Sequence, residues 1–221
     1  MGPRTTMFPN NPATGKGLVV LGIVPGWGFN LPTAKIGNAF DAMNDDGPRY
    51  QNSLMSEEEF EEATDTTVVE GDHHDYEGYL RLKYTTWKSQ TNTDAIAELN
   101  YTTNWRLIRY ADVLLMAAEA YNEDGDQQSA LTELNKVHER AGLDEYDAMD
   151  QAELREAIKK ERQLELAFEG SRYWDLIRWG DAEEELGPFG FVSGKHEHFP
   201  IPQTEISSNN EISQEDQNPG F

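Results

Sequence analysis

The sequence contains no cysteine, so it can form neither a disulfide framework nor a thiolate metal site. It also lacks a long apolar run, because the longest one, residues 17–24, is far shorter than the roughly 18–20 residues of a membrane-spanning helix. Basic residues are scarce: 18 Lys and Arg stand against 41 Asp and Glu, which gives a net charge of −23. A field of that sign repels phosphate backbones and anionic lipid headgroups. We therefore expect no nucleic-acid partner and no membrane-surface binding by charge.

Short motifs of common catalytic and nucleotide-binding sites are also missing. The sequence has no G-x-S-x-G, no Walker loop, no dinucleotide-binding glycine pattern and no Cys/His pair. The histidine pairs at 73–74 and at 196 and 198 have no third ligand at a suitable spacing, so we interpret them as surface residues. The sequence therefore predicts no metal, no cofactor and no enzymatic activity.

The N-terminal part, residues 1–103, is expected to be loop-rich. Residues 1–55 are rich in Gly, Pro and Asn and carry repeated turn signals, which favours extended loops and short strands. Ser56 and Glu59 have the spacing of a capping box, which predicts a short acidic helix with Phe60 facing inward. Alternating large and charged residues at 79–84 indicate a half-buried strand.

The next part, residues 104–180, is expected to be a helical scaffold. Residues 106–125 are rich in Ala and Leu and close on Gly125, and Asp126 begins a second helix that stops at Gly142. Two antiparallel helices around a tight turn are therefore predicted at 106–141. Six residues of this hairpin fit the pattern of a tetratricopeptide repeat: Ala118, Tyr121, Gly125, Ala130, Leu134 and Val137.

One repeat of this kind buries its apolar face against neighbouring repeats, and about three are normally needed for stability. Because one such unit is visible, we expect this sequence to be the later part of a longer protein. After the hairpin, the capping-box spacing of Asp150 and Glu153 predicts a helix that ends at Gly170. A short aromatic helix that ends at Gly180 follows, and residues 181–221 are expected to form an extended tail.

Glutamates recur every four residues in the predicted helix, at Glu161, Glu165 and Glu169. A glycosidase needs carboxylates on opposite sides of the scissile bond, about 5–10 Å apart, whereas one helix face offers them all from one side. We therefore favour a partly buried ion network that ties two helices together, and keep a glycoside hydrolase as an alternative. The expected pairs are Arg162 with Glu165, Arg172 with Glu169, and Asp175 with Arg172 or Arg178.

Aromatic residues in the Gly-, Pro- and Asn-rich loops are the remaining functional candidates. A flat ring beside amides and carboxylates can stack on a sugar face while the polar groups bond its hydroxyls. The alternative for each ring is that it fills a gap beneath a loop. Tyr50 is another aromatic residue of these loops, and both interpretations apply to it. The candidate ligand-binding residues are Phe8, Trp27, Phe29, Asn30 and Trp87. By contrast, Trp105, Trp174 and Trp179 lie on predicted helices and are expected in the core.

Four segments resemble the C-terminal half of the SusD/RagB family: residues 104–123 (NWRLIRYADVLLMAAEAYNE), 130–143, 157–180 and 199–221. The resemblance extends upstream through residues 26–50 and 78–84, so it covers nearly the whole chain. It implies a mainly α-helical, SusD-like fold, in which a tetratricopeptide-type hairpin and packed helices stand beside an irregular loop-rich part with a few short strands. In that fold, the unit at 106–141 is the last repeat.

The resemblance also implies a function. SusD/RagB proteins are nutrient-uptake lipoproteins on the outer-membrane surface of Bacteroidota, which capture oligosaccharides or polysaccharides without catalysis and pass them to a SusC-like TonB-dependent transporter. The family's first half normally holds the lipidated cysteine, so a lipid anchor is expected in an N-terminal segment missing from this sequence. The residues alone leave one further alternative, a tetratricopeptide-type adaptor for a protein partner.

Overall fold

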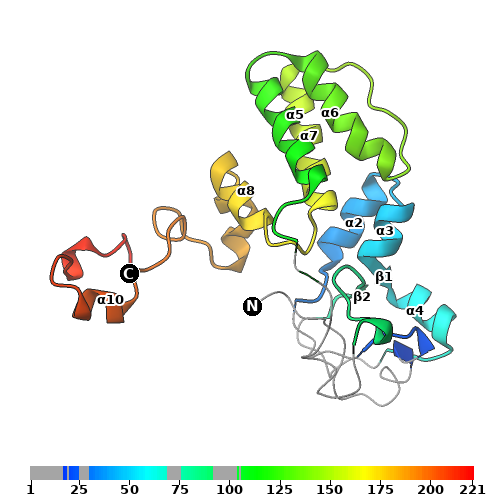
Figure 1. The fold of residues 1–221 in the computed structure, drawn as a ribbon, viewed down its shortest axis with the longest axis horizontal. Coiled ribbons are helices and arrows are strands. Elements are labelled where there is room, and N and C mark those ends of the chain that lie inside the picture. Colours follow the sequence, from blue (N-terminus) through cyan, green and yellow to red (C-terminus); the bar gives the residue numbers. More distant parts are fainter. Residues whose placement is uncertain (1–16, 19, 25–29, 69–75, 92–103, 105) are drawn as a thin grey trace. The chain divides into compact units, whose positions relative to one another are not determined.

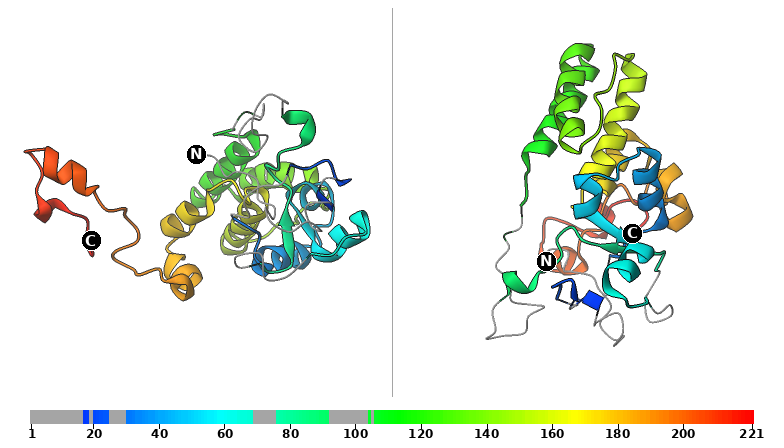
Figure 2. Two further views of the ribbon diagram at one scale, coloured as in Figure 1. Left: turned by 90° about the horizontal axis from the view of Figure 1, so that it is seen from below. Right: turned by 90° about the vertical axis from the view of Figure 1, so that its right-hand side faces the viewer.

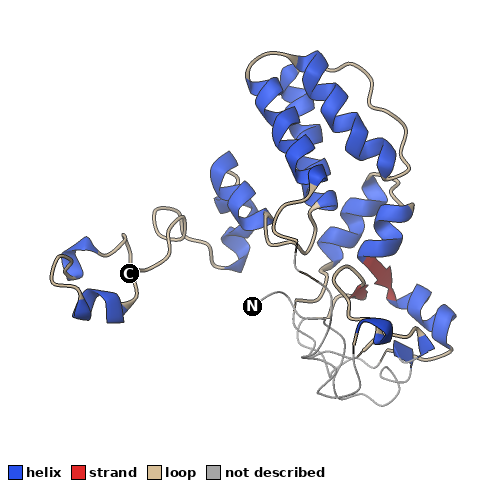
Figure 3. Cartoon of the chain, viewed as in Figure 1, coloured by secondary structure: helices blue, strands red, loops and turns tan. Residues whose placement is uncertain are grey.

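The computed structural model describes residues 17–221 except 19, 25–29, 69–75, 92–103 and 105. The chain divides into two compact units, Met1–Glu169 and Gly170–Phe221. Most of the described chain is helical, and its regular strands form one two-stranded sheet (Figure 3). The predicted mainly α-helical fold is therefore confirmed.

Three helices of the first unit pack side by side: α5 (Tyr110–Glu123), α6 (Gln127–Arg140) and α7 (Gln151–Glu165) (Figures 1 and 2). Leu115, Ala118 and Leu134 are completely buried between them. The turn between α5 and α6 has Gly125 at φ 86°, a backbone conformation that glycine adopts without strain. Asp126 caps α6 by accepting a hydrogen bond from the Ser129 amide, so the predicted helical hairpin is confirmed.

The ends of these helices differ from the prediction. Helix α5 begins at Tyr110 rather than at residue 106, because Arg109 has extended backbone and sends its side chain to α7. Helix α7 begins at the predicted capping box, in which the Asp150 side chain accepts hydrogen bonds from two amides. It ends at Glu165, before the predicted stop, and Gly170 completes the turn that follows at φ 87°.

A smaller part of the first unit surrounds a short sheet. Strand β1 (Leu54–Ser56) pairs antiparallel with β2 (Tyr79–Arg81), so the predicted strand at 79–84 is present over its first three residues. Helix α4 (Glu57–Thr64) follows β1 with the predicted capping box. Phe60 is completely buried, as expected, and packs with Leu18 and Leu80.

Two helices lie where the sequence favours loops and short strands: α2 (Ala34–Ala42) and α3 (Pro48–Ser53). The prediction was wrong there because Gly and Pro were taken as helix breakers. Gly37 lies inside α2, and a Cβ at this position would overlap the ring of Tyr79. Pro48 stands at the first position of α3, where its missing amide proton costs no intrahelical hydrogen bond.

In the second unit, α8 (Arg172–Trp179) ends at Gly180 as predicted, with φ 80°. Short helices interrupt the expected extended tail: α9 (Ala182–Leu186), η3 (Gly187–Phe189), α10 (Gln203–Ser208) and η4 (Gln214–Asp216). His196 lies in a turn rather than in a strand, and its Nδ1 accepts a hydrogen bond from the Val192 amide. Trp174 is 50% exposed, so its expected core position is wrong.

Candidate functional site

A pocket of about 440 Å³ opens beside Trp87 in the first unit. It lies between the end of α3, the loop after β2, the short helix η1 (Lys88–Gln90) and the segment before α5. We call it the Trp87 pocket. Its lining includes Gln51, Asn52, Tyr84, Trp87, Gln90 and Arg106.

The backbone around Trp87 holds this side chain at the surface. Tyr84 adopts φ 59°, a left-handed conformation that turns the chain sharply after β2. Trp87 forms an antiparallel bridge with Ile23, and its amide donates a 3.1 Å hydrogen bond to Gln90 Oε1. The Trp87 side chain stays 39% exposed, so it is not a core residue.

The lining also includes the side-chain amides of Gln51 and Asn52, which hydrogen bonds hold in place. Asn52 Nδ2 donates to the Pro48 carbonyl oxygen at 2.7 Å, and Gln51 Nε2 donates to the Asp46 carbonyl oxygen at 3.0 Å. These hydrogen bonds orient both amides. A partly exposed indole beside oriented amides can hold a flat, hydroxyl-rich molecule by stacking and hydrogen bonding.

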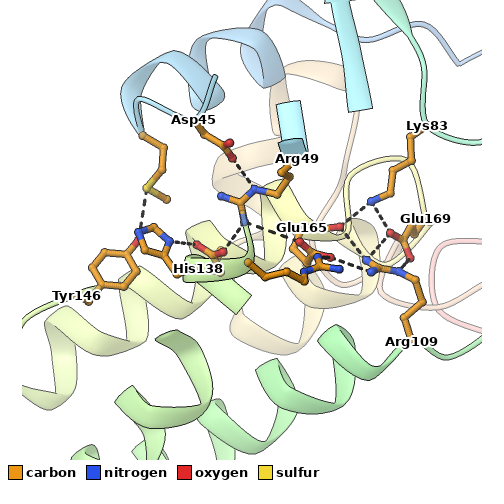
Figure 4. Close-up of polar contacts among 11 residues, drawn as sticks. Asp45, Arg49, Lys83, Arg109, His138, Tyr146, Glu165 and Glu169 are labelled. Carbon is orange, nitrogen blue, oxygen red and sulfur yellow. Dashed lines mark hydrogen bonds and ion pairs between the residues drawn. The ribbon is translucent and has the colours of Figure 1, made fainter. Parts of the chain in front are cut away.

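An ion network (Figure 4) adjoins this pocket through Lys83 and Arg109, which are part of the pocket lining. Its members are Asp45, Arg49, Lys83, Arg109, Arg140, Glu161, Glu165 and Glu169. Arg109 Nη1 lies 2.8 Å from Glu165 Oε1, and its Nη2 lies 2.6 Å from Glu169 Oε1. Burial alone would lower the pKa of Arg109, but its hydrogen bonds to these two carboxylates raise that pKa above its ordinary value.

The network continues inward through Arg49. Its Nε lies 2.5 Å from Asp45 Oδ2, and its Nη1 pairs with Glu161. The second oxygen of Glu161 is 2.8 Å from His138 Nδ1, and the His138 ring stacks on Tyr146 (Figure 4). Burial raises the pKa of Asp45 although Arg49 opposes the shift, and burial raises the pKa of Tyr146 to about 12.

Glu161 and Glu165 are buried and Glu169 is half-buried, and the partners of all three come from outside α7. Glu161, Glu165 and Glu169 pair with basic side chains that the sequence did not single out: Arg49, Lys83, Arg109 and Arg140. Arg49 precedes Glu161 by 112 residues, so no local spacing could reveal the pair.

The remaining members of the predicted network have partners that differ in part from those predicted, which were Glu165 for Arg162, Glu169 for Arg172, and Arg172 or Arg178 for Asp175. Arg162 Nη1 lies 2.9 Å from Asp112 Oδ1 on α5. In the second unit, Asp175 pairs with Arg178 at 2.9 Å, which is one of its two predicted partners. Arg172 lies 3.9 Å from Glu185.

One of the predicted ligand-binding residues, Trp87, lines the pocket. Asn30 is exposed with φ 59°, and it is not part of the described lining of the Trp87 pocket. Phe8, Trp27 and Phe29 lie outside the described residues. Tyr50 packs edge to face on Phe40 and donates a hydrogen bond to Glu59, which is the gap-filling role considered for it.

The sequence predicts neither a metal site nor a membrane-spanning helix. Across the described ranges, no three His, Asp or Glu side chains gather in a way that could hold a metal ion. His73 and His74 lie outside these ranges. No described helix combines the length and the apolar character needed to cross a bilayer.

Sequence comparison identifies relatives of this chain. The model of the SusD family matches residues 32–195. The chain is 31% identical over 170 residues to the SusD-like protein P38 of Formosa agariphila, and the match covers 70% of this chain and 34% of that protein.

Solved structures show the same similarity. A laminarin-binding SusD-like protein matches 100% of this chain with a TM-score of 0.74 and 32% identity. The surface glycan-binding protein A from Bacteroides uniformis matches 97% with a TM-score of 0.64 and 25% identity. The matches cover 43% and 45% of those two chains, so this chain spans less than half the length of each relative.

Proposed function

Because this chain belongs to the SusD family, we propose that it is part of a non-catalytic glycan receptor that holds a sugar against Trp87. The observation that carries the proposal is the Trp87 pocket, with its partly exposed indole and the oriented amides of Gln51 and Asn52. Aromatic faces and amides supply the stacking and hydrogen bonds that a sugar needs. The glycan ligands of the two structural relatives support the same ligand class.

We further propose that the bound oligosaccharide passes to a SusC-like TonB-dependent transporter at the outer-membrane surface, where a lipid anchor holds the receptor. The support for this partner and location is family membership. Co-purification with a TonB-dependent transporter from native membranes tests it. A receptor that is recovered without a transporter contradicts the delivery step.

The buried carboxylates support binding rather than hydrolysis. A general acid of a glycosidase needs a raised pKa. Burial alone would raise the pKa of Glu165, but its hydrogen bonds with Arg109 and the nearby charge of Arg140 lower it below its ordinary value. Glu165 therefore stays ionised and serves the ion network.

An adaptor for a protein partner is a second candidate, because α5 and the residues before it expose apolar side chains. These are Leu107, Ile108, Tyr110, Val113, Met116 and Tyr121. Such a stripe suits the packing of a neighbouring helical repeat, whereas adaptors of this class grip their ligands in a polar concave groove. Further tandem repeats encoded upstream, together with capture of a peptide by a polar groove, would favour the adaptor.

Isothermal titration of the protein with a panel of oligosaccharides, laminarihexaose included, tests the proposed sugar site. We expect at least one glycan to bind, and Trp87→Ala to weaken that binding about tenfold through lost stacking and lost apolar contact. Trp174→Ala is the matched control, because Trp174 is also partly exposed but does not line the pocket. Its affinity should equal that of the wild type.

Two results would contradict this proposal. One is the absence of binding to every glycan in the panel by the folded protein. The other is equal affinity of the wild type and Trp87→Ala for a glycan that does bind.

A further inference from the structure

Basic side chains gather around the Trp87 pocket although the chain as a whole is strongly acidic. Two further pockets, of about 380 and 410 Å³, adjoin it, and all three share Arg109 in their linings. Together they are lined by six basic residues: Arg49, Lys83, Arg106, Arg109, Lys136 and Arg140. The acidic residue in these linings is Glu165. We call this surface the basic patch.

The basic patch reverses the charge balance of the chain. It uses six of the 18 Lys and Arg residues and one of the 41 Asp and Glu residues. A concave surface with low-dielectric walls concentrates the field of the charges that line it. An anion is therefore repelled less at this surface than elsewhere on the molecule, although neighbouring carboxylates balance much of the positive charge.

Most of these cations already have carboxylate partners. Lys83 and Arg109 pair with glutamates of the ion network, and Lys136 lies 2.7 Å from Glu133. Arg140 gives one 2.5 Å contact to Glu165 while 58% of its side chain stays exposed. These side chains contribute positive potential, but their carboxylate partners already occupy part of their N–H donors.

Arg106 differs from the other cations. It is exposed at the edge of the Trp87 pocket, and it makes no ion pair within the part of the chain that the structure describes. Its guanidinium carries five N–H donors in a planar fork that matches the paired oxygens of a carboxylate or a sulfate. Trp87 lines the same pocket, so a sugar ring on the indole could place an acidic substituent near Arg106.

We propose that the Trp87 pocket selects an acidic glycan, whose carboxylate or sulfate group is bound by Arg106 while a sugar ring stacks on Trp87. This proposal rests on the proposed function and adds the charge of the ligand to it. Arg106 is then a specificity-determining residue. The remaining cations of the basic patch attract the acidic chain but do not choose the sugar unit.

Matched pairs of oligosaccharides test the selection of charge. The first pair is mannuronate tetrasaccharide and mannotetraose, in which each carboxylate of the acidic member is replaced by a hydroxymethyl group in the neutral one. The second pair is a carrageenan tetrasaccharide and its desulfated form. In titrations at 50 mM NaCl, we expect the acidic member of at least one pair to bind tenfold tighter or more. This advantage should shrink at 500 mM NaCl, because salt screens exposed charges.

The Arg106→Gln variant tests the assigned residue. We expect it to reduce the acidic-over-neutral ratio about fivefold, the upper range for one exposed ion pair. Arg155→Gln is the matched control, because Arg155 is also partly exposed, pairs with Glu123 and does not line these pockets. The control should keep the wild-type ratio.

The possible failures are distinguishable. Equal affinity for acidic and neutral members of both pairs, or an unchanged ratio in Arg106→Gln, overturns the acidic selection alone when a neutral glycan still binds through Trp87. No binding of any glycan, or binding that Trp87→Ala leaves unaltered, overturns the sugar site itself and with it this inference.

Discussion

Glu165 is the side chain on which the ion network converges. It is 2% exposed, and its Oε1 accepts hydrogen bonds from Arg109 at 2.8 Å and from Arg140 at 2.5 Å. The Glu165 backbone carbonyl oxygen also accepts from Lys83 Nζ at 2.6 Å. One residue therefore links α7 to α6, to the segment before α5 and to the loop after β2. The last two of these segments also line the Trp87 pocket.

Replacing this carboxylate should destabilise the fold in a pH-dependent way. Glu165→Gln leaves the half-buried Arg109 short of a partner and weakens the contact with the exposed Arg140, and we expect a loss of about 3 kcal/mol in the free energy of unfolding at pH 7. The folded-state pKa of Glu165 lies below its ordinary value of 4.5. The stabilisation is therefore fully present above pH 4.5 and is lost as the pH falls through the folded-state pKa.

Urea denaturation of the wild type and Glu165→Gln at pH 7, 5 and 3 measures this effect. The difference between the two proteins should shrink between pH 5 and pH 3. Glu123→Gln is the control, because Glu123 forms an exposed ion pair with Arg155 and should change the free energy of unfolding little. A difference that stays constant down to pH 3 would show that Glu165 does not act through its charge.

For single residues, the sequence predicts motifs of nearby residues but not ion pairs between residues far apart in the chain. Ser56 and Asp150 cap their helices through side chains three residues apart, so spacing alone predicts both motifs. Of the three predicted glutamates, Glu161 and Glu165 are buried in α7, whereas Glu169 follows the end of that helix. Arg49 and Arg109 reach them across 112 and about 60 residues, and such pairs are formed by tertiary packing that no short pattern encodes.

Among the elements, α2 shows how packing overrides propensity. Gly37 is buried at its centre, and the ring of Tyr79 in β2 occupies the space of the missing Cβ. The short helix thereby comes close to the sheet that leads into the Trp87 pocket. A glycine that weakens the helix locally is therefore used to bring the two elements together.

Gly37→Ala should destabilise the protein although alanine is the better helix former. The gain in helix propensity is about 1 kcal/mol, whereas displacing the Tyr79 ring costs about 1–3 kcal/mol, so we expect no gain and up to about 2 kcal/mol of net loss. Asn38→Ala, at the exposed neighbouring position, should be neutral or slightly stabilising. Thermal melts compare the three proteins, and a higher melting temperature for Gly37→Ala would contradict the packing argument.

The longer helices could be predicted because several signals agree in each of them. Helices α6 and α7 have side-chain caps, and α8 ends at a glycine with positive φ. Helix α3 has six residues and α2 has nine, with Gly or Pro inside their bounds, so sequence signals there conflict. Short elements of this kind are decided by contacts with the rest of the fold.

For the whole molecule, the net charge and the length of the chain bear on the proposed function. A net charge of −23 keeps most of the surface acidic, and the basic patch around Arg109 is a local exception to it. The chain spans less than half the length of its structural relatives, and α5 exposes an apolar stripe that suits a neighbouring repeat. That companion repeats lie outside this sequence stays a prediction, as do the anchor and the transporter.

The composition of the Trp87 pocket was only partly predictable. Trp87 stood out as an aromatic residue in a polar loop, whereas Gln51, Asn52 and Arg106 carried no signal of their own. They come from segments on either side of β2 and meet through the fold. The sequence therefore points to the exposed indole of this pocket but not to the polar groups around it.

The central claim is that a sugar ring rests on Trp87. A crystal structure of the protein with a glycan that binds in the titrations tests it most directly. We predict density for a sugar ring stacked on the Trp87 indole, with hydroxyl groups within hydrogen-bonding distance of the Gln51 or Asn52 amides. A glycan bound elsewhere on the protein, with the Trp87 pocket left to water, would contradict the claim.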